Sequence, residues 1–301
     1  MSIATVAATP TVPAPKGSGI KIRKLTEHIG AEVTGADLTK PIDAETQRLL
    51  NEAIVEHTAL VIRDQRFTPK QFLEATRVFG TPMLRPSGTG SLEEDPIVHT
   101  VSSRQVDKDG VPMKTGTRWH TDHTNLEAPS KYTILYAVEL PVSGGGTSVC
   151  SMRAAYESLT EAQKRRFLTM KTANVILGSA VRSYGRGMAN IQALQEKFKQ
   201  EPVIHPLVVT HPINGTKALF FNPLKTENIL GMTPEDTQDF FEDLIDEVTR
   251  PEFIYTHQWR LGDMFLWDNR ASLHKAGDDY KVVDGRHRTL LRVIVEGDPL
   301  H

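Results

Sequence analysis

The chain has 301 residues, of which 39% are hydrophobic and 24% charged, an ordinary globular composition that excludes wholesale disorder and fibrous repeats. Its 35 basic and 37 acidic residues give a net charge of −2, which argues against a dedicated nucleic-acid-binding protein. No apolar run approaches the roughly 18 residues of a membrane span, so we expect no membrane partner. The single cysteine, Cys150, excludes an internal disulfide and favours a reducing compartment, which we expect to be the cytoplasm.

The first 19 residues are rich in Ala, Thr, Pro and Ser and contain neither an acidic residue nor an arginine. They lack the basic and apolar stretches of a signal peptide. Because prolines recur at positions 10, 13 and 15, we predict a disordered tail over residues 1–19. We see no convincing linker or repeat after it, so residues 20–301 are predicted to form a single domain.

The elements predicted up to residue 79 mix strands and helices. Alternating apolar and basic residues favour a strand at the start, and a short apolar run favours a buried strand at Ala59–Ile62. Asp43 and Thr68 are typical N-caps, and Pro69 suits the first helical position after Thr68. In chain order we expect strands at 20–25 and 32–35, a helix at 43–57, a strand at 59–62 and a helix at 68–79.

Further along the chain, strands predominate. Asn214 and Gly215 indicate a tight turn between two strands, and Thr233 followed by Pro234 starts a helix. In chain order we expect a strand at 132–138, helices at 160–170 and 190–199, strands at 204–210 and 217–222, a helix at 233–250, and strands at 253–259, 263–267 and 290–296. Because the helices do not alternate with the strands, the fold class is predicted to be mainly β with flanking helices, a sandwich or jelly roll.

Candidate metal ligands begin with the string Trp119-His120-Thr121-Asp122. On a strand, residues two apart point to the same face, so His120 and Asp122 could converge on one point. An imidazole and a carboxylate supply two thirds of the facial triad that holds ferrous iron. His274, which follows the Asp-Asn turn of Trp267-Asp268-Asn269-Arg270, is the candidate third ligand. The alternative is that this segment is only a turn and that His274 lies at the surface.

Two arginines follow the second histidine. Arg288 and Arg292 are four residues apart and would share one face of a strand, where a guanidinium can grip a carboxylate through two hydrogen bonds. The alternative is a pair of solvated charges, since Arg286 and His287 make this segment basic.

Taken together, these strings resemble the Fe(II)/2-oxoglutarate-dependent dioxygenases, and more narrowly the taurine dioxygenase/2,4-dichlorophenoxyacetate dioxygenase (TauD/TfdA) family. The resemblance runs from Ile20 to Pro299 and also includes Ile29-Gly30-Ala31-Glu32-Val33, Gly144-Gly145-Gly146-Thr147 and Met152-Arg153-Ala154-Ala155-Tyr156. It implies a double-stranded β-helix, the jelly roll. The order and spacing of the strings make the resemblance highly specific.

By this resemblance, His120, Asp122 and His274 match the iron ligands. Arg288 and Thr147 match the residues that bind the distal carboxylate of 2-oxoglutarate, and Arg292 matches an arginine near co-substrate and substrate. The implied cofactors are Fe(II), 2-oxoglutarate as co-substrate, and O₂. The implied reaction hydroxylates a substrate, with or without cleavage of the product, while 2-oxoglutarate becomes succinate and CO₂.

The expected substrate is a small anionic organic molecule: a sulfonate, an alkyl sulfate or an aryloxyalkanoate. Arg85 stands where the taurine enzyme has a histidine, and Gly116 stands where it has an asparagine, so the sequence departs from the taurine pattern. Arg85 and Lys225 are candidate substrate-binding cations beside Arg292. Trp119 is expected to pack behind the iron site. Residues 182–187 have the composition of a loop that could cover the site.

Three alternatives stay open at this stage. The chain could be a non-catalytic jelly roll that binds a small acid, although such a protein has no use for three metal ligands. It could be a zinc hydrolase with the same ligands, although this gives Arg288 and Thr147 no role. The scaffold could also run a desaturation or another oxidative rearrangement. We expect a homo-oligomer, a dimer or a tetramer.

Overall fold

The computed structural model describes residues 19–84, 90–106, 115–178 and 200–300. The predicted tail up to residue 18, the predicted helix at 190–199 and the candidate loop at 182–187 lie outside these residues. The described helices are α1 (Ala44–His57), α2 (Pro69–Thr76), α3 (Met152–Ser158), α4 (Glu161–Phe167) and α7 (Pro234–Val248), with 3₁₀ turns at Arg77–Phe79 and Pro251–Phe253. No helix among the described residues is long and apolar enough to cross a membrane.

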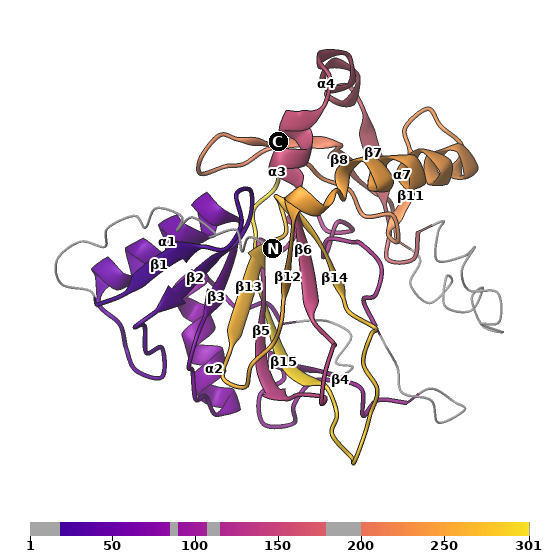
Figure 1. Cartoon of the computed structure of the whole chain (residues 1–301). Coiled ribbons are helices and arrows are strands. Elements are labelled where there is room, and N and C mark those ends of the chain that lie inside the picture. The colour runs from indigo at the N-terminus through magenta and orange to yellow at the C-terminus, as the bar shows by residue number, and fades with distance from the viewer. Residues whose placement is uncertain (1–18, 85–89, 107–114, 179–199, 301) are drawn as a thin grey trace, which may run out of the picture.

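The largest sheet has seven strands in the order β1-β2-β3-β13-β5-β15-β4. All its neighbours are antiparallel except β2 and β3. Its strands are β1 (Lys21–Lys24), β2 (Ala31–Thr34), β3 (Ala59–Ile62), β4 (His99–Ser102), β5 (Tyr132–Glu139), β13 (Met264–Asp268) and β15 (Thr289–Val295). In Figure 1, α1 and α2 cover one side of this sheet. Their apolar faces bury Leu50, Ile54 and Phe72 in the largest core cluster.

A second sheet has the order β12-β6-β14 and is antiparallel throughout. Its strands are β12 (Ile254–His257), β6 (Thr147–Ser151) and β14 (Ser272–Ala276). A core cluster containing Val149, Leu135, Phe265 and Trp267 joins the two sheets, so they form the two layers of a jelly roll. This confirms the predicted fold class.

Two smaller sheets and three helices cover the outer side of the second layer (Figure 1). These sheets contain β7 (Lys171–Asn174), β8 (Val203–Pro206), β9 (Val208–Thr210), β10 (Lys217–Leu219) and β11 (Thr226–Ile229), in the orders β11-β7-β8 and β10-β9. Cys150 and Leu273 pack with α3, α4 and α7 in a third core cluster. Residues that alternate along β6 and β14 therefore face either this cluster or the jelly-roll interior.

The helix starts agree with the sequence. The Asp43 side chain accepts a hydrogen bond from the Thr46 amide at 2.7 Å, and Thr68 forms a capping box. The turn at Asn214-Gly215 joins β9 and β10 as predicted. The predicted strand at 204–210 is wrong in one respect, because it breaks at Leu207 into two strands that pair with different partners.

Candidate active site

The metal-ligand candidates meet inside the jelly roll. His120 and His274 form an isolated antiparallel bridge, in which the His274 amide donates to the His120 carbonyl at 2.7 Å and the reverse bond is 3.1 Å. Their ring centroids are 4.2 Å apart. Ligand atoms of His120, Asp122 and His274 all lie within 4.8 Å of one another. The structure therefore brings the three predicted residues together, but the local structure assumed for them is wrong, because the His-x-Asp string is a loop rather than a strand.

Hydrogen bonds fix the orientation of His120 and Asp122, the two ligand candidates on the loop. The Nδ1 atom of His120 lies 2.7 Å from the Arg118 carbonyl oxygen, so Nδ1 carries the proton and Nε2 keeps a free lone pair. Asp122 accepts a 2.7 Å hydrogen bond at Oδ2 from Thr133 on β5. The same Oδ2 lies 3.9 Å from Nε2 of His274.

Electrostatics keep Asp122 and His274 in the protonation states that bind metal. Burial would raise the pKa of Asp122, but the neighbouring His274 and His123 side chains and the Arg292 guanidinium lower it well below its ordinary value. Burial, helped by His120, lowers the pKa of His274 well below its ordinary value. The arrangement therefore offers a carboxylate together with a neutral His274 imidazole, as metal coordination requires.

Arg288 is buried at the other end of the same cavity. Its Nε donates to the Gly145 carbonyl at 2.7 Å and its Nη2 donates to the Thr147 hydroxyl at 3.1 Å. Burial lowers the pKa of Arg288 to about 10, because removal from water disfavours the cation. Gly145 has a φ of +69°, and a Cβ there would lie 3.0 Å from Cδ of Arg288. A glycine is thus needed for the arginine to fit.

The hydroxyl of Thr147 can still donate one hydrogen bond. Its oxygen accepts from Trp259 Nε1 at 3.1 Å as well as from Arg288. Two donors fill both lone pairs of a hydroxyl oxygen, so the Thr147 proton is left for an acceptor in the cavity. A guanidinium and a hydroxyl proton side by side suit a carboxylate.

Arg292 on β15 lines the cavity between these two ends. Its Nε is buried and has no hydrogen-bond partner among the described residues. The cavity has a volume of about 290 Å³. Its described lining comprises Thr100, Val101, Gln105, Thr115, Gly116, His120, Thr133, Leu135, Thr147, Trp267, His274, Ala276, Arg288 and Arg292.

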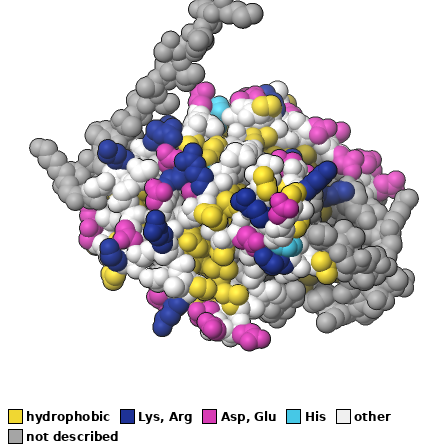
Figure 2. All heavy atoms as spheres, turned by 60° about the horizontal axis from the view of Figure 1, so that its bottom comes forward, with side chains coloured by type: hydrophobic (Ala, Val, Ile, Leu, Met, Phe, Trp, Pro, Cys, Tyr) yellow, Lys and Arg dark blue, Asp and Glu magenta, His cyan; other side chains and the backbone are white. Residues whose placement is uncertain are grey.

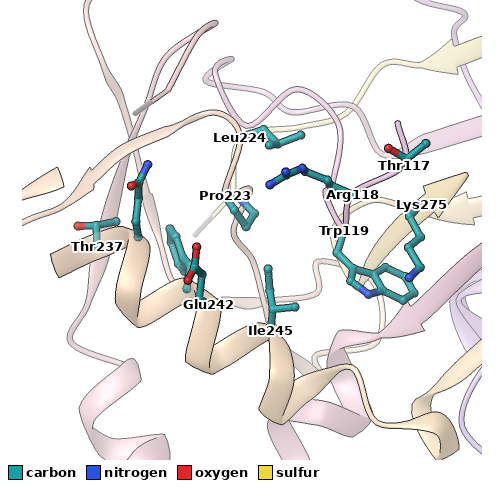
Figure 3. A pocket seen from close by; sticks show the side chains of 11 residues that line it. Thr117, Arg118, Trp119, Pro223, Leu224, Thr237, Glu242, Ile245 and Lys275 are labelled. Atoms are coloured by element: carbon teal, nitrogen blue, oxygen red, sulfur yellow. The ribbon is translucent and has the colours of Figure 1, made fainter. Parts of the chain in front are cut away.

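The remaining predicted residues lie elsewhere. Arg85 is outside the described residues. Lys225 does not line this cavity, and its Nζ donates to the Ile176 carbonyl at 3.3 Å. Trp119 packs behind the site as expected: it faces a separate pocket against α7, where Lys275 Nζ lies 4.7 Å from its ring centroid (Figure 3).

Several lining residues were not predicted from the sequence. Thr133 and Trp267 lie within predicted strands but were given no role at the site, and Thr100 and Gln105 lie on or beside β4, which was not predicted. A threonine near the start of the otherwise largely apolar run 132–138 was the available signal for Thr133.

The donor set fits the cofactors that the resemblance implies. Two histidines and one carboxylate on one side of a cavity leave coordination positions open, as in non-haem Fe(II) oxygenases. The buried Arg288, with Thr147, provides for an anion at the far end. The two ends share one cavity, so one molecule could bind to both.

Comparisons with known proteins agree with this geometry. Residues 21–294 match the family model "Taurine catabolism dioxygenase TauD, TfdA family". The chain is 31% identical to an alkylsulfatase of Acinetobacter baylyi over 93% of this chain and 86% of that protein. It is 29% identical to an alpha-ketoglutarate-dependent sulfate ester dioxygenase of Pseudomonas putida, over 95% of this chain and 92% of that protein.

A solved structure, AAD-2 in complex with Mn(II) and N-oxalylglycine, superposes with a TM-score of 0.78. It is 28% identical to this chain and covers 94% of this chain and 99% of its own. Because the family model spans nearly the whole chain, this protein belongs to the TauD/TfdA family and is a 2-oxoglutarate-dependent dioxygenase that uses Fe(II) and O₂.

Proposed function

We propose that His120, Asp122 and His274 hold the iron and that Arg288 and Thr147 hold the distal carboxylate of 2-oxoglutarate. The observation that carries this proposal is a single cavity lined by His120, His274 and the buried Arg288, with a carboxylate oxygen of Asp122 within 4.8 Å of the histidine ligand atoms. Iron at the first end would supply the oxidative chemistry, in which O₂ and 2-oxoglutarate become succinate and CO₂ and one oxygen atom enters the substrate.

The protein's own groups position the reactants. The Arg288 guanidinium and the Thr147 proton would fix the distal carboxylate, so the keto-acid end of the co-substrate faces the ligand set. The walls formed by Leu135 and Trp267 keep this part of the cavity apolar. Arg292, with its buried and unpartnered Nε, is the remaining cation in the described lining and would orient a second anion, the substrate.

We propose an alkyl sulfate as the primary substrate. Two relatives that cover most of the chain are named for sulfate esters, and Arg292 supplies a positive charge for the sulfate group. Hydroxylation of the carbon that carries the ester oxygen gives an unstable product, which breaks its C–O bond to release sulfate and leave an aldehyde. Sulfonates and aryloxyalkanoates are the competing classes.

The first test is anaerobic. Fe(II) and 2-oxoglutarate are added to the metal-free protein, and the visible charge-transfer band of a chelated keto acid is recorded. Alkyl sulfates, sulfonates and aryloxyalkanoates are then added in turn. We expect the band to appear and to shift with alkyl sulfates. Iron binding without a band would overturn the co-substrate assignment, and a shift with another class alone would overturn the substrate assignment.

Variants then locate the substrate cation. Arg292→Met should abolish the band shift caused by the substrate while the band itself persists. Lys225→Met tests the sequence-based prediction that Lys225 binds substrate. If Lys225→Met leaves KM unchanged, that prediction is wrong. Arg85→Met tests the corresponding prediction for Arg85 and should change substrate preference without altering 2-oxoglutarate affinity.

We also propose that residues 20–301 form one domain, that the enzyme works in the cytoplasm, and that it is a homo-oligomer. The lone cysteine supports a reducing compartment.

Exposed hydrophobic side chains support the homo-oligomer. Leu261, 65% exposed, and Val138, 48% exposed, line a surface hollow. Figure 2 shows hydrophobic side chains gathered on the face that comes forward from the bottom of Figure 1. Light scattering after size exclusion tests the oligomer, and a monomeric mass would contradict it.

A further inference from the structure

Asp122 is held by a short chain of side-chain hydrogen bonds that begins at Asn269. The Asn269 amide nitrogen Nδ2 donates to Oγ1 of Thr133 at 3.0 Å and to Oγ of Ser130 at 3.2 Å. Thr133 in turn donates to Oδ2 of Asp122 at 2.7 Å. Thr133 and Asn269 are each only 1% exposed, so water does not compete for these bonds.

The direction of each bond in this chain is determined by chemistry. An ionised carboxylate only accepts, so the Thr133 proton must point to Asp122. The neighbour of Thr133 on its other side must then be a donor, which orients the Asn269 amide with its NH₂ group toward Thr133. Oδ1 of Asn269 has no hydrogen-bond partner among the described residues, so the two donor bonds alone set the amide.

Asn269 also contacts the loop between His120 and Asp122. Thr121 lies between His120 and Asp122, and its hydroxyl donates to the Asn269 carbonyl at 2.7 Å. Asn269 lies at the turn between β13 and β14, five residues before His274. One buried residue therefore contacts the loop that carries two ligand candidates and lies in the turn that leads to the strand that carries the third.

This support replaces the one that the sequence suggested. A strand would hold residues 120–122 by a regular backbone ladder, but here only the bridge at His120 is formed. Side chains must hold this loop instead. The hydrogen bonds that run from Asn269 through Thr133 reach the Asp122 carboxylate. Loss of this support would leave Asp122 free to rotate about its side-chain torsions.

We propose that Thr133 and Asn269 are positioning residues that fix the carboxylate of Asp122 for metal binding. The proposal rests on the ligand set proposed above. Thr133 holds Oδ2, the oxygen that lies 3.9 Å from Nε2 of His274, and Asn269 keeps the Thr133 proton pointing that way. Partners that orient a metal ligand in this way typically contribute about 10–100-fold to metal affinity.

The chain contains a matched control pair. Thr172 on β7 is also 1% exposed, accepts from the Asn174 amide at 2.9 Å and donates to the His205 carbonyl at 3.4 Å. It lies in the β11-β7-β8 sheet and does not line the cavity. Thr172→Val therefore removes the same kind of buried hydroxyl without reaching Asp122, and Asn174→Asp makes the same change as Asn269→Asp.

The experiment measures Mn(II) binding to the metal-free full-length chain by calorimetry, without 2-oxoglutarate or substrate. We expect Thr133→Val to weaken Mn(II) binding by about 10–100-fold and Thr133→Ser to restore it. Asn269→Asp places a second acceptor beside Thr133 and should weaken binding at least as much. Thr172→Val and Asn174→Asp should leave Mn(II) affinity unchanged. Circular dichroism confirms that each variant is folded, and Asn269→Asp carries the test if Thr133→Val does not fold.

The outcomes separate this proposal from the one on which it rests. If the unaltered chain does not bind Mn(II), or if His120→Ala binds it equally well, the ligand set itself is wrong. If the unaltered chain binds Mn(II) and Thr133→Val and Asn269→Asp bind it equally well, the ligand set stands and the positioning role is wrong. An equal loss in Thr172→Val would also overturn the positioning role, since the effect would then be one of general stability.

Discussion

Two clusters of charged side chains in the fold differ in whether every polar atom has a hydrogen-bond partner. The closed cluster contains Asp268, Arg270 and His211. The open cluster contains His120, Asp122, His274, Arg288 and Arg292. Both contain a carboxylate whose pKa is lowered despite burial, because cations surround it.

In the closed cluster every charge has a charged or polar partner. Oδ1 of Asp268 accepts from the backbone amide and Nε of Arg270, both at 2.9 Å. Its Oδ2 accepts from Arg270 Nη2 at 2.6 Å and lies 3.0 Å from His211 Nε2. Such a cluster joins parts of the chain distant in sequence and leaves no capacity for a ligand.

The open cluster has capacity left at both ends. Nδ1 of His274 and Nε of Arg292 are buried without a hydrogen-bond partner among the described residues, and Arg288 donates to two neutral oxygens. Buried polar atoms without partners are costly, so they indicate where a ligand belongs. The closed and the open cluster both contain buried charges. They differ in whether each polar atom has a hydrogen-bond partner.

The largest expected effect is on metal binding. His120→Ala removes one proposed ligand and should reduce turnover to background and abolish Mn(II) binding, measured by calorimetry. Because His120 is only partly buried, stability of the metal-free protein should change by no more than about 1–2 kcal/mol. His211→Ala is the matched change in the closed cluster and should destabilise the protein while Mn(II) still binds. Normal turnover of His120→Ala would contradict the ligand assignment.

Breaking the closed cluster should give the opposite result. Asp268→Asn leaves Arg270 buried without its counter-charge, and we expect a loss of about 3–5 kcal/mol in the free energy of unfolding. Urea denaturation measures it.

The pH dependence of this variant sharpens the comparison. Since folding lowers the pKa of Asp268, its stabilisation is present above the pKa of the unfolded carboxyl and is lost as pH falls toward the folded value. The difference between the two proteins should therefore shrink in acid. A constant difference down to acid pH would argue against an ionised Asp268.

Replacement of Arg288 should weaken 2-oxoglutarate binding without destabilising the metal-free protein. Arg288→Met should weaken 2-oxoglutarate binding by about 2–5 kcal/mol because the distal carboxylate loses its buried partner. Burial lowers the pKa of Arg288, which means that its charge destabilises the fold, so the metal-free variant should be as stable as the unaltered chain or more stable. Calorimetry and thermal unfolding measure the two effects, and a variant with unchanged affinity would move the carboxylate site elsewhere.

The smallest effect concerns Cys150, which belongs to neither cluster. It lies on β6 facing the core under α7, its Sγ donates to the Val248 carbonyl, and burial raises the pKa of its thiol to about 12. A disulfide reagent at pH 8 should therefore not react with the folded protein and should react once in urea. Rapid reaction of the folded chain would show that this core opens readily.

The parts of the fold that were predictable depend on local chemistry. Asp43 and Thr68 cap their helices through bonds to residues three positions away, and the run Ala59–Ile62 is apolar throughout, so the sequence alone indicates them. The strand β14 was not predicted. Its residues Ser272–Ala276 mix polar and apolar side chains because one face lines the cavity and the other lines a core.

The candidate residues of the site could be proposed from the sequence, but the contacts that support them could not. His120, Asp122, His274 and Arg288 occur in strings with distinctive spacing. Thr133 and Asn269 act through contacts between residues 136 positions apart, and no spacing rule reveals such contacts.

The pairing of β6 with β14 fixes a length. Val149 lies opposite His274, and Thr147 lies opposite Ala276, two residues further along. Two residues of strand span about 7 Å, which is close to the reach of an extended five-carbon diacid. In the site proposed above, the strand pair would thus set the spacing between His274 and Thr147, and a keto diacid of another length would fit it less well.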